Sequence, residues 1–164
     1  MKKILPVLLS VLLFTSCICS GCSRSTVPPY DPTDFSCTLA IDSVSAGAPG
    51  YFTGEFVSDC GTAVLSVTEP ASLAGLTFTF RDSGCVMDAC GVSVPLSGEV
   101  SASLTALADL ICSAPADALD KNGTVLVYSM GQLTFDDAGY PVLAETADGR
   151  RAEITFHNPE QNLT

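Results

Sequence analysis

Apolar and polar residues alternate along much of this chain. From Phe35 to Ile41 the apolar side chains occupy every second position, with serine, threonine and alanine between them. The same pattern recurs over residues 52–56 and 76–80. A period of two places one set of side chains on a buried face and the other in water. These segments are therefore predicted to be half-buried antiparallel strands.

Shorter segments with strand character extend the pattern. Further strands are expected over residues 63–68, 85–88, 92–94, 124–130, 133–135, 141–145 and 150–156. The segment 124–130 is apolar on both faces, which is typical of a central strand. Turn sequences at residues 136–139 and 146–149 join the last three of these strands as hairpins.

One segment has the period of a helix. Apolar residues recur at i, i+3, i+4 and i+7 from Leu104 to Ile111, which predicts an amphipathic helix over residues 101–112. Pro115 ends this helix, and a second short helix is expected over residues 115–119.

These elements predict an α+β protein that is mostly β. The expected architecture is a curved antiparallel meander sheet of about nine strands, with one or two helices on its concave face. A helix of about 12 residues is about 18 Å long and cannot cover that face alone. Either the sheet closes on itself as a barrel or sandwich, or an apolar cleft remains. Eight residues are candidates both for ligand binding in such a cleft and for plain core packing: Leu39, Ile41, Phe52, Phe56, Phe78, Phe80, Leu107 and Ile111.

The first 22 residues have a different organisation. Two lysines precede an apolar run over residues 4–14, and small residues follow it. This order is that of a secretory signal, and the run is shorter than the about 20 residues of a transmembrane helix. Cys17 and Cys22 both fit the cysteine that receives diacylglycerol in a bacterial lipoprotein, and Cys22 is slightly favoured. The pattern predicts a lipid anchor on the extracytoplasmic face of the cell membrane; the alternative is an ordinary cleaved signal and a free secreted domain.

Composition divides the remainder of the chain. Residues 23–33 are rich in proline and serine and lack periodicity, so they are expected to form a semi-extended tether. Residues 34–159 follow as a single β-rich domain, and residues 160–164 as a tail. The domain has about 130 residues, which is enough for one hydrophobic core.

The chain is strongly acidic. Its formal net charge is −11, and removal of Lys2 and Lys3 with the signal leaves −13. Such a domain repels phosphate backbones, so no nucleic-acid partner is expected. It also repels anionic lipid headgroups, so attachment to the membrane is expected through the lipidated cysteine.

The cysteines after residue 22 do not indicate a metal site. There are five of them, so at least one is unpaired: Cys37, Cys60, Cys85, Cys90 and Cys112. Cys37 and Cys112 fall on apolar faces, where cysteine packs as a small hydrophobe. Cys85 and Cys90 flank an expected turn, which leaves both a disulfide and free thiols open. No pair has the two-residue spacing of a zinc site, and neither a metal nor another cofactor is expected.

Candidate catalytic groups are few. His157 is the one histidine, and strand alternation places it on the polar face near the end of the chain. No serine lies in a Gly-x-Ser-x-Gly context, and the carboxylate pair Asp136–Asp137 falls in a turn. We expect a protein that is not an enzyme, and an exported hydrolase is the third and least supported hypothesis.

The order of elements resembles a known family. A lipobox, a tether, a meander sheet, a Pro-x-x-Leu-x-Gly segment (Pro70, Leu73, Gly75) and a mid-chain helix are similar to the LolA/LolB-like lipoprotein-carrier superfamily. The chain is also similar to small uncharacterised lipoproteins of clostridial bacteria. The resemblance covers roughly residues 35–159. It implies an open half-barrel around a hydrophobic cavity that helices plug, in proteins that bind acyl chains or act as envelope accessory proteins.

Two hypotheses of function remain. In the first, a membrane-anchored, non-catalytic domain binds a hydrophobic ligand, an acyl chain or lipid, or an apolar segment of a partner. In the alternative, an envelope assembly or scaffold protein binds another exported protein through a sheet edge or a loop, and needs no cavity.

Overall fold

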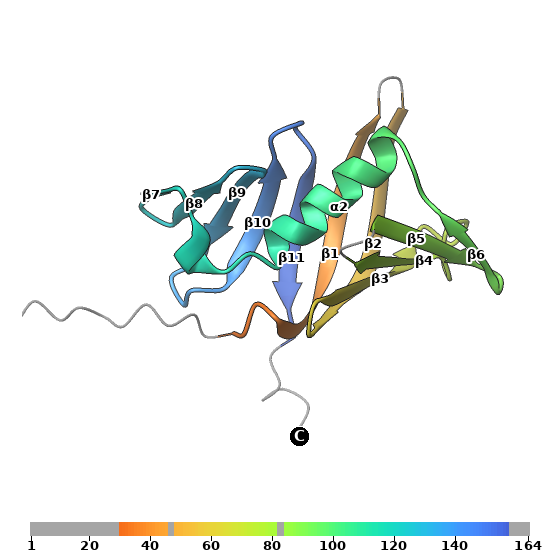
Figure 1. The fold of residues 1–164 in the computed structure, drawn as a ribbon, viewed down its shortest axis with the longest axis horizontal. Coiled ribbons are helices and arrows are strands. Elements are labelled where there is room, and N and C mark those ends of the chain that lie inside the picture. Colours follow the sequence, from red (N-terminus) through yellow and green to blue (C-terminus); the bar gives the residue numbers. More distant parts are fainter. Residues whose placement is uncertain (1–29, 46–47, 82–83, 158–164) are drawn as a thin grey trace, which may run out of the picture.

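A computed structural model describes residues 30–45, 48–81 and 84–157, and in this part of the chain eleven strands form one sheet (Figure 1). The strands are β1 (Asp34–Ser45), β2 (Ala48–Asp59), β3 (Thr62–Glu69), β4 (Thr77–Arg81), β5 (Gly84–Ala89), β6 (Val92–Pro95), β7 (Asp120–Asn122), β8 (Val125–Tyr128), β9 (Gly131–Phe135), β10 (Pro141–Thr146) and β11 (Arg151–Phe156). Their order across the sheet is β6-β5-β4-β3-β2-β1-β11-β10-β9-β8-β7.

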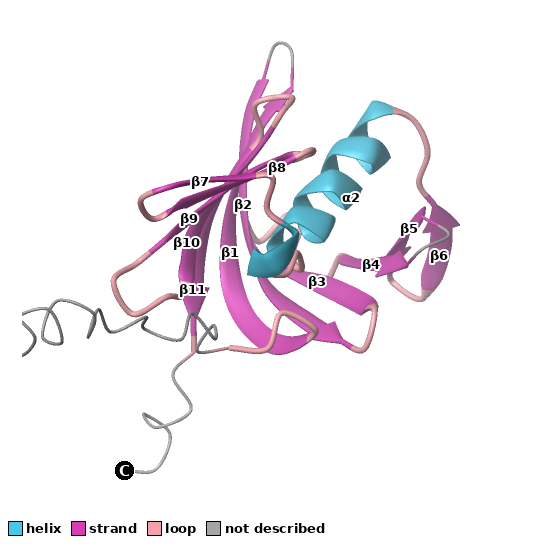
Figure 2. Ribbon diagram, turned by 60° about the vertical axis from the view of Figure 1, so that its left-hand side comes forward, coloured by secondary structure: helices cyan, strands magenta, loops and turns pink. Residues whose placement is uncertain are grey.

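The sheet consists of two meanders that meet at its centre. All neighbouring strands are antiparallel, and all but one pair follow each other in the sequence. The exception joins β1 to β11, where Cys37 lies opposite Phe156 and Ile41 opposite Ala152. The strands on either side of this central pair rise as two wings, and β6 and β7 remain unpaired edges (Figure 2). The predicted fold class, an open half-barrel that is mostly β, is confirmed.

Helix α2 (Glu99–Ile111) lies on the concave side, between the two wings (Figure 2). Its buried stripe includes Leu104, Leu107 and Ile111, as the periodicity predicted. These side chains share one hydrophobic core with the inward residues of β1 and β2. A single turn of 3-10 helix, η1 (Pro115–Asp117), follows where a second short helix was expected.

Two hairpins in the first half of the sheet turn through a Cys-Gly pair. Cys60 and Gly61 join β2 to β3 with φ angles of 46° and 88°. Cys90 and Gly91 join β5 to β6 with φ angles of 50° and 82°. Two consecutive positive φ angles define a type I′ turn, whose twist matches that of the paired strands.

Two expectations need correction. The segment 124–130 is not central: β8 is the last strand but one, because β7 pairs with it at the edge of the sheet. No turn separates Cys85 from Cys90, since the residues between them belong to the continuous strand β5. Five residues of strand span about 16 Å, well beyond the about 7 Å that a disulfide bridges. Both thiols are free.

The hydrophobic core begins before β1. Tyr30, which the sequence assigned to the tether, is buried in the core against Phe35 and Phe156. The expected signal sequence, Cys17 and Cys22 lie outside the described residues. Within the residues described, no helix has the length and apolar character needed to span a bilayer.

Candidate functional site

The eight candidate ligand-binding residues come together on the concave face beneath α2. All are buried in the core except Phe52, which is half-buried and packs against it. Their side chains therefore belong to one hydrophobic core, to which the helix contributes Leu107 and Ile111. Although the helix is short, it covers the centre of the sheet, because both wings curve toward it (Figure 2).

The contact between α2 and the β10–β11 hairpin is polar as well as apolar. The Ser103 hydroxyl donates a hydrogen bond of 2.6 Å to Oδ2 of Asp148, in the turn between these strands. The Thr146 hydroxyl donates to the other oxygen of the same carboxylate, and Arg150 Nε lies 3.7 Å from Oδ2. The hydrogen bonds from Ser103 and Thr146 hold the pKa of Asp148 below its ordinary value. We call this cluster the Asp148 latch.

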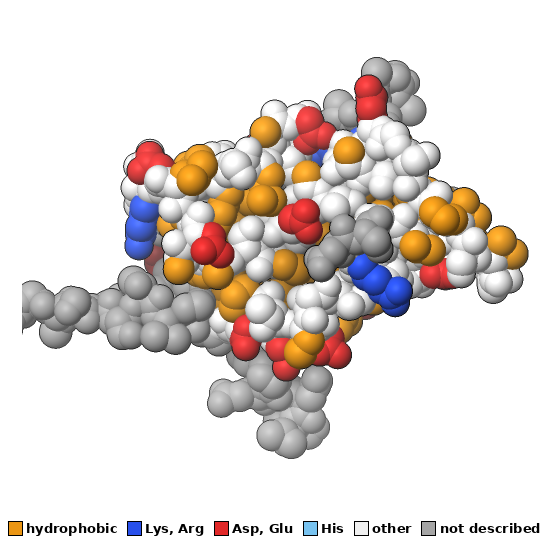
Figure 3. All heavy atoms as spheres, in the orientation of Figure 1, with side chains coloured by type: hydrophobic (Ala, Val, Ile, Leu, Met, Phe, Trp, Pro, Cys, Tyr) orange, Lys and Arg blue, Asp and Glu red, His pale blue; other side chains and the backbone are white. Residues whose placement is uncertain are grey.

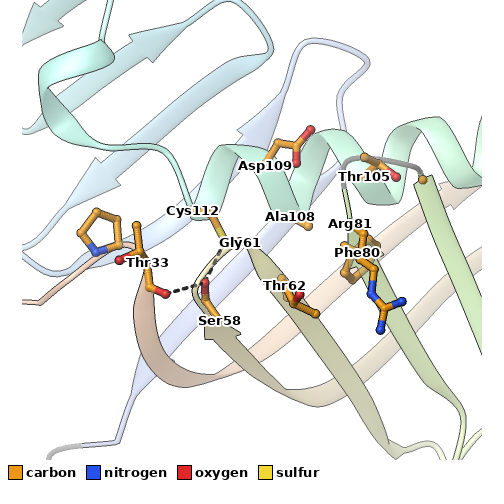
Figure 4. A pocket seen from close by; sticks show the side chains of 13 residues that line it. Thr33, Ser58, Gly61, Thr62, Phe80, Arg81, Thr105, Ala108, Asp109 and Cys112 are labelled. Carbon is orange, nitrogen blue, oxygen red and sulfur yellow. Dashed lines mark hydrogen bonds between the residues drawn. The ribbon is translucent and has the colours of Figure 1, made fainter.

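The contact between α2 and the opposite wing leaves a groove. It has a volume of about 510 Å³ and lies between the C-terminal half of the helix and the ends of β3 and β4 (Figure 4). Its lining consists of Pro32, Thr33, Ser58, Gly61, Thr62, Ala63, Phe80, Arg81, Gly84, Thr105, Ala108, Asp109 and Cys112. We call it the α2 groove.

The groove is amphipathic. Phe80 and Ala108 supply apolar surface on its two sides. At one end Cys112 Sγ donates to Ser58 Oγ over 3.6 Å, and Ser58 Oγ donates to the Thr33 carbonyl over 3.5 Å. Burial raises the pKa of the Cys112 thiol, so this end is a neutral hydrogen-bonding site and not a thiolate nucleophile.

Sequence reasoning found one residue of this groove, Phe80, and missed its polar part. The groove forms where the entry to β1, the β2–β3 turn, the end of β4 and the helix meet. Each segment contributes one or a few small residues with no motif of their own. No local signal in the sequence identifies such a site.

A second cavity lies at the start of β1 and the end of β11. Its volume is about 710 Å³, and four aromatic rings line it: Tyr30, Phe35, Tyr140 and Phe156. The rings pack mainly against each other, with centroids 5.1 Å apart for Tyr30 and Phe156 and 5.2 Å for Tyr140 and Phe156. This mutual packing fixes Tyr30 on the domain.

His157 lies on the convex side of the sheet. Its Nε2 is 2.9 Å from Glu55 Oε2 and 3.0 Å from Thr38 Oγ1. In a catalytic triad the acid and the nucleophile contact opposite ring nitrogens, whereas here both contact the same one. The side chain is 49% exposed, and His157 lines the second cavity, whose lining includes neither Thr38 nor Glu55. Within the described ranges, no cluster of His, Cys, Asp and Glu could hold a metal ion.

Comparisons with known proteins give similarity to solved structures. No protein-family model matches the chain, and no curated protein matches it. Among solved structures, it is similar to the LolA superfamily protein NE2245 from Nitrosomonas europaea, with 14% sequence identity and a TM-score of 0.43. The similarity covers 82% of this chain and 91% of that one.

Proposed function

We propose that this chain is an exported lipoprotein, anchored through Cys22 or Cys17 on the extracytoplasmic face of the cell membrane. Its domain binds a hydrophobic ligand, an acyl chain or an apolar segment of a partner, and catalyses no reaction. The ligand lies in the α2 groove, with its apolar part against Phe80 and Ala108.

This proposal is based on the way α2 covers the concave face, which differs between the two wings. On one side α2 is fixed by the Asp148 latch, while on the other it stands away from β3 and β4 and leaves about 510 Å³. Ligand pockets in proteins typically measure about 300–1,000 Å³, with apolar walls and a few polar groups that orient the ligand. The hydroxyls of Ser58, Thr62 and Thr105 are suited to that orienting role.

The position of the groove fits a ligand taken from the membrane. Pro32 and Thr33 line it, and they follow directly on the predicted tether. Pro32 is ten positions after Cys22 in the sequence. A chain of that length spans at most about 36 Å, so the groove stays close to the bilayer when the cysteine is lipidated.

Native mass spectrometry tests the proposal. A chain beginning at Ser23 keeps every described strand and the whole described core, and is purified without detergent. We expect a stoichiometric adduct with the mass of a fatty acid or phospholipid, either as purified or after incubation with membrane lipids. The bound molecule is then identified by organic extraction.

Two variants locate the ligand. Thr105→Phe fills the groove from the helix and should reduce the adduct at least tenfold. Ala102→Phe adds the same side chain at an exposed position of the same helix and should leave it unchanged. A chain that carries no adduct under any of these conditions would favour the alternative, an envelope assembly protein that binds another exported protein.

A further inference from the structure

The two free edges of the sheet are built differently. Strand β7, at one edge, is Asp120-Lys121-Asn122, and charged side chains are a common protection of an edge against pairing. Strand β6, at the other edge, is Val92-Ser93-Val94-Pro95 and carries no charge. All four of its residues are exposed, Val92 by 61% and Val94 by 43%. Apolar side chains gather on the surface at this end of the molecule (Figure 3).

The turn before β6 determines which backbone groups reach the free edge. In a two-residue type I′ hairpin the backbones of the two flanking residues, here Ala89 and Val92, form hydrogen bonds with each other. Hydrogen-bonded and non-hydrogen-bonded pairs then alternate along the two strands, so the backbone of Val94 also forms hydrogen bonds with β5. The Leu96 N–H, which donates to the Cys85 carbonyl over 2.9 Å, continues this alternation. The N–H and C=O of Ser93 therefore point away from the sheet.

Pro95 occupies the other outward position. It lies opposite Val86 in a non-bonded pair, so its missing N–H removes no bond to β5. The free edge thus offers one residue with both a donor and an acceptor, Ser93, between two exposed valines.

We propose that β6 pairs with β6 of a second copy of this chain, antiparallel and centred on Ser93. Ser93 exchanges both backbone hydrogen bonds with the partner's Ser93. Val92 then lies opposite the partner's Val94, and Val94 opposite the partner's Val92. These are non-bonded pairs, in which side chains lie closest, so four valines form one apolar cluster. The two sheets join into one, with both concave faces on the same side.

The chemistry of the edge favours a second copy over other occupants. Self-pairing is isologous and closes after two copies. Because β6 has no charged residue, its self-pairing brings no like charges of the two strands together, although each chain without its signal has a net charge of −13. Pairing of β6 with β7 would place Asp120 and Lys121 against the valines and would continue into open filaments. Where the proposed lipid anchor holds both copies in one membrane, their effective concentration is raised, so that a short interface suffices.

A single cysteine tests the register. Residues of a bonded antiparallel pair have Cα atoms about 5.5 Å apart, which lies within the range of a disulfide. Ser93→Cys is introduced into the full chain, with the exposed Cys60 and Cys90 replaced by asparagine, and the chain is expressed in membranes. Copper–phenanthroline accepts the two electrons as two thiols release their protons and form the disulfide. We expect a band of twice the chain mass on a non-reducing gel.

Two further variants supply the controls. Ser72→Cys places a thiol in an exposed position of the loop between β3 and β4, away from the proposed axis, and should not cross-link. Val94→Lys, added to Ser93→Cys, puts a charge into the valine cluster and should reduce the cross-linked fraction about tenfold. Val94 is exposed in the single chain, so the fold should tolerate this change.

The outcomes are distinct. Equal cross-linking of Ser93→Cys and Ser72→Cys indicates random collision and overturns the proposal, as does the absence of a product. A product of another mass shows that a different protein occupies the edge, which also overturns it. Ser93→Pro gives an independent measurement, because it removes the outward N–H and leaves the backbone hydrogen bonds to β5; only the side-chain hydrogen bond from Ser93 to Asp88 is also lost. In the chain beginning at Ser23, this variant should increase the monomer fraction measured by sedimentation over a range of concentrations. Its circular dichroism spectrum should not change.

Discussion

The two wings of the half-barrel differ in how they contact α2 and in how their outer edges are built. The β7–β10 wing is tied to α2 by the Asp148 latch, and Tyr128 of β8 donates a hydrogen bond of 3.4 Å to the Ala114 carbonyl just after the helix. The β2–β6 wing contacts the helix mainly through apolar side chains, leaves the α2 groove beside it, and ends in an uncharged edge.

Exposure within the β2–β6 wing follows the position of each strand between the centre and the edge of the sheet. Leu65, Phe78, Met87 and Val94 lie opposite one another in a row across β3 to β6, on the concave face. Leu65 is 1% exposed and Phe78 9%, Met87 is half-buried, and Val94 is 43% exposed. Equivalent apolar positions thus become core on the inner strands of the wing and free surface on its edge strand. A wing that extends past its helix retains apolar surface that is available for binding.

The largest difference between the wings is expected in the free energy of unfolding lost when an apolar side chain is truncated in each of them. Leu133→Ala, on β9, removes a fully buried side chain and should lower the free energy of unfolding by about 2–5 kcal/mol. Val92→Ala, on the exposed edge, should lower it by less than about 0.5 kcal/mol. Urea unfolding measures both, and similar losses would show that the β6 edge is packed in solution.

The Asp148 latch should give the next largest effect. Ser103→Ala removes the hydrogen bond between the helix and the carboxylate, and should cost about 1–2 kcal/mol. Ser101→Ala is the matched control, since it removes another buried serine hydroxyl of the same helix. If both variants lose the same stability, the latch does not hold the helix.

Acid should weaken the same latch. The pKa of Asp148 is lower in the folded protein than in the unfolded chain, so its contribution is complete above the unfolded value of about 3.9. That contribution is lost as the pH falls through the folded value. The difference in unfolding free energy between wild type and Ser103→Ala should therefore shrink below pH of about 4. A difference that stays constant with pH would contradict this assignment.

The two Cys-Gly turns lie in the β2–β6 wing, and substitution of their cysteines should modestly raise the free energy of unfolding. Cys60 and Cys90 adopt positive φ, which asparagine tolerates better than cysteine. Cys60→Asn and Cys90→Asn should each raise the free energy of unfolding by about 0.5–1 kcal/mol, measured in urea. Serine at the same positions has no such preference and serves as the control. A loss on asparagine substitution would imply that the thiols make a contact beyond the turn.

A substitution on the convex side of the sheet should change the free energy of unfolding least. His157 and Glu55 form an exposed pair between the end of β11 and β2. His157→Ala should change the free energy of unfolding by less than about 0.5 kcal/mol, since exposed ion pairs contribute little. A loss of 2 kcal/mol or more, by about the scale of a buried hydrogen bond, would mark this pair as structural.

Much of the fold could be predicted because the pattern that encodes it is local. The alternation at residues 35–41 and 76–80 and the helical stripe from Leu104 to Ile111 appear where expected. Strand β7 was missed because its three polar residues have no buried face. Strand β8 was wrongly expected at the centre, because an apolar pattern on both faces does not reveal how many strands lie beside it.

The candidate site was harder to predict. The sequence identified the apolar residues of the concave face, yet Leu39 and Phe56 are core. The α2 groove instead depends on Thr33, Ser58 and Thr105, which come from separate elements and meet only through tertiary contacts. Small hydroxyl residues are common throughout the chain, so nothing distinguishes these three in advance.

Local patterns along the chain specify most of the strands, helix α2 and the tight turns, because these depend on residues two to four positions apart. The pairing of β1 with β11 and the position of α2 across the sheet depend instead on long-range contacts. These contacts join opposite ends of the domain, and their geometry depends on how the whole apolar surface packs. The same contacts decide which apolar side chains become core, groove or free edge.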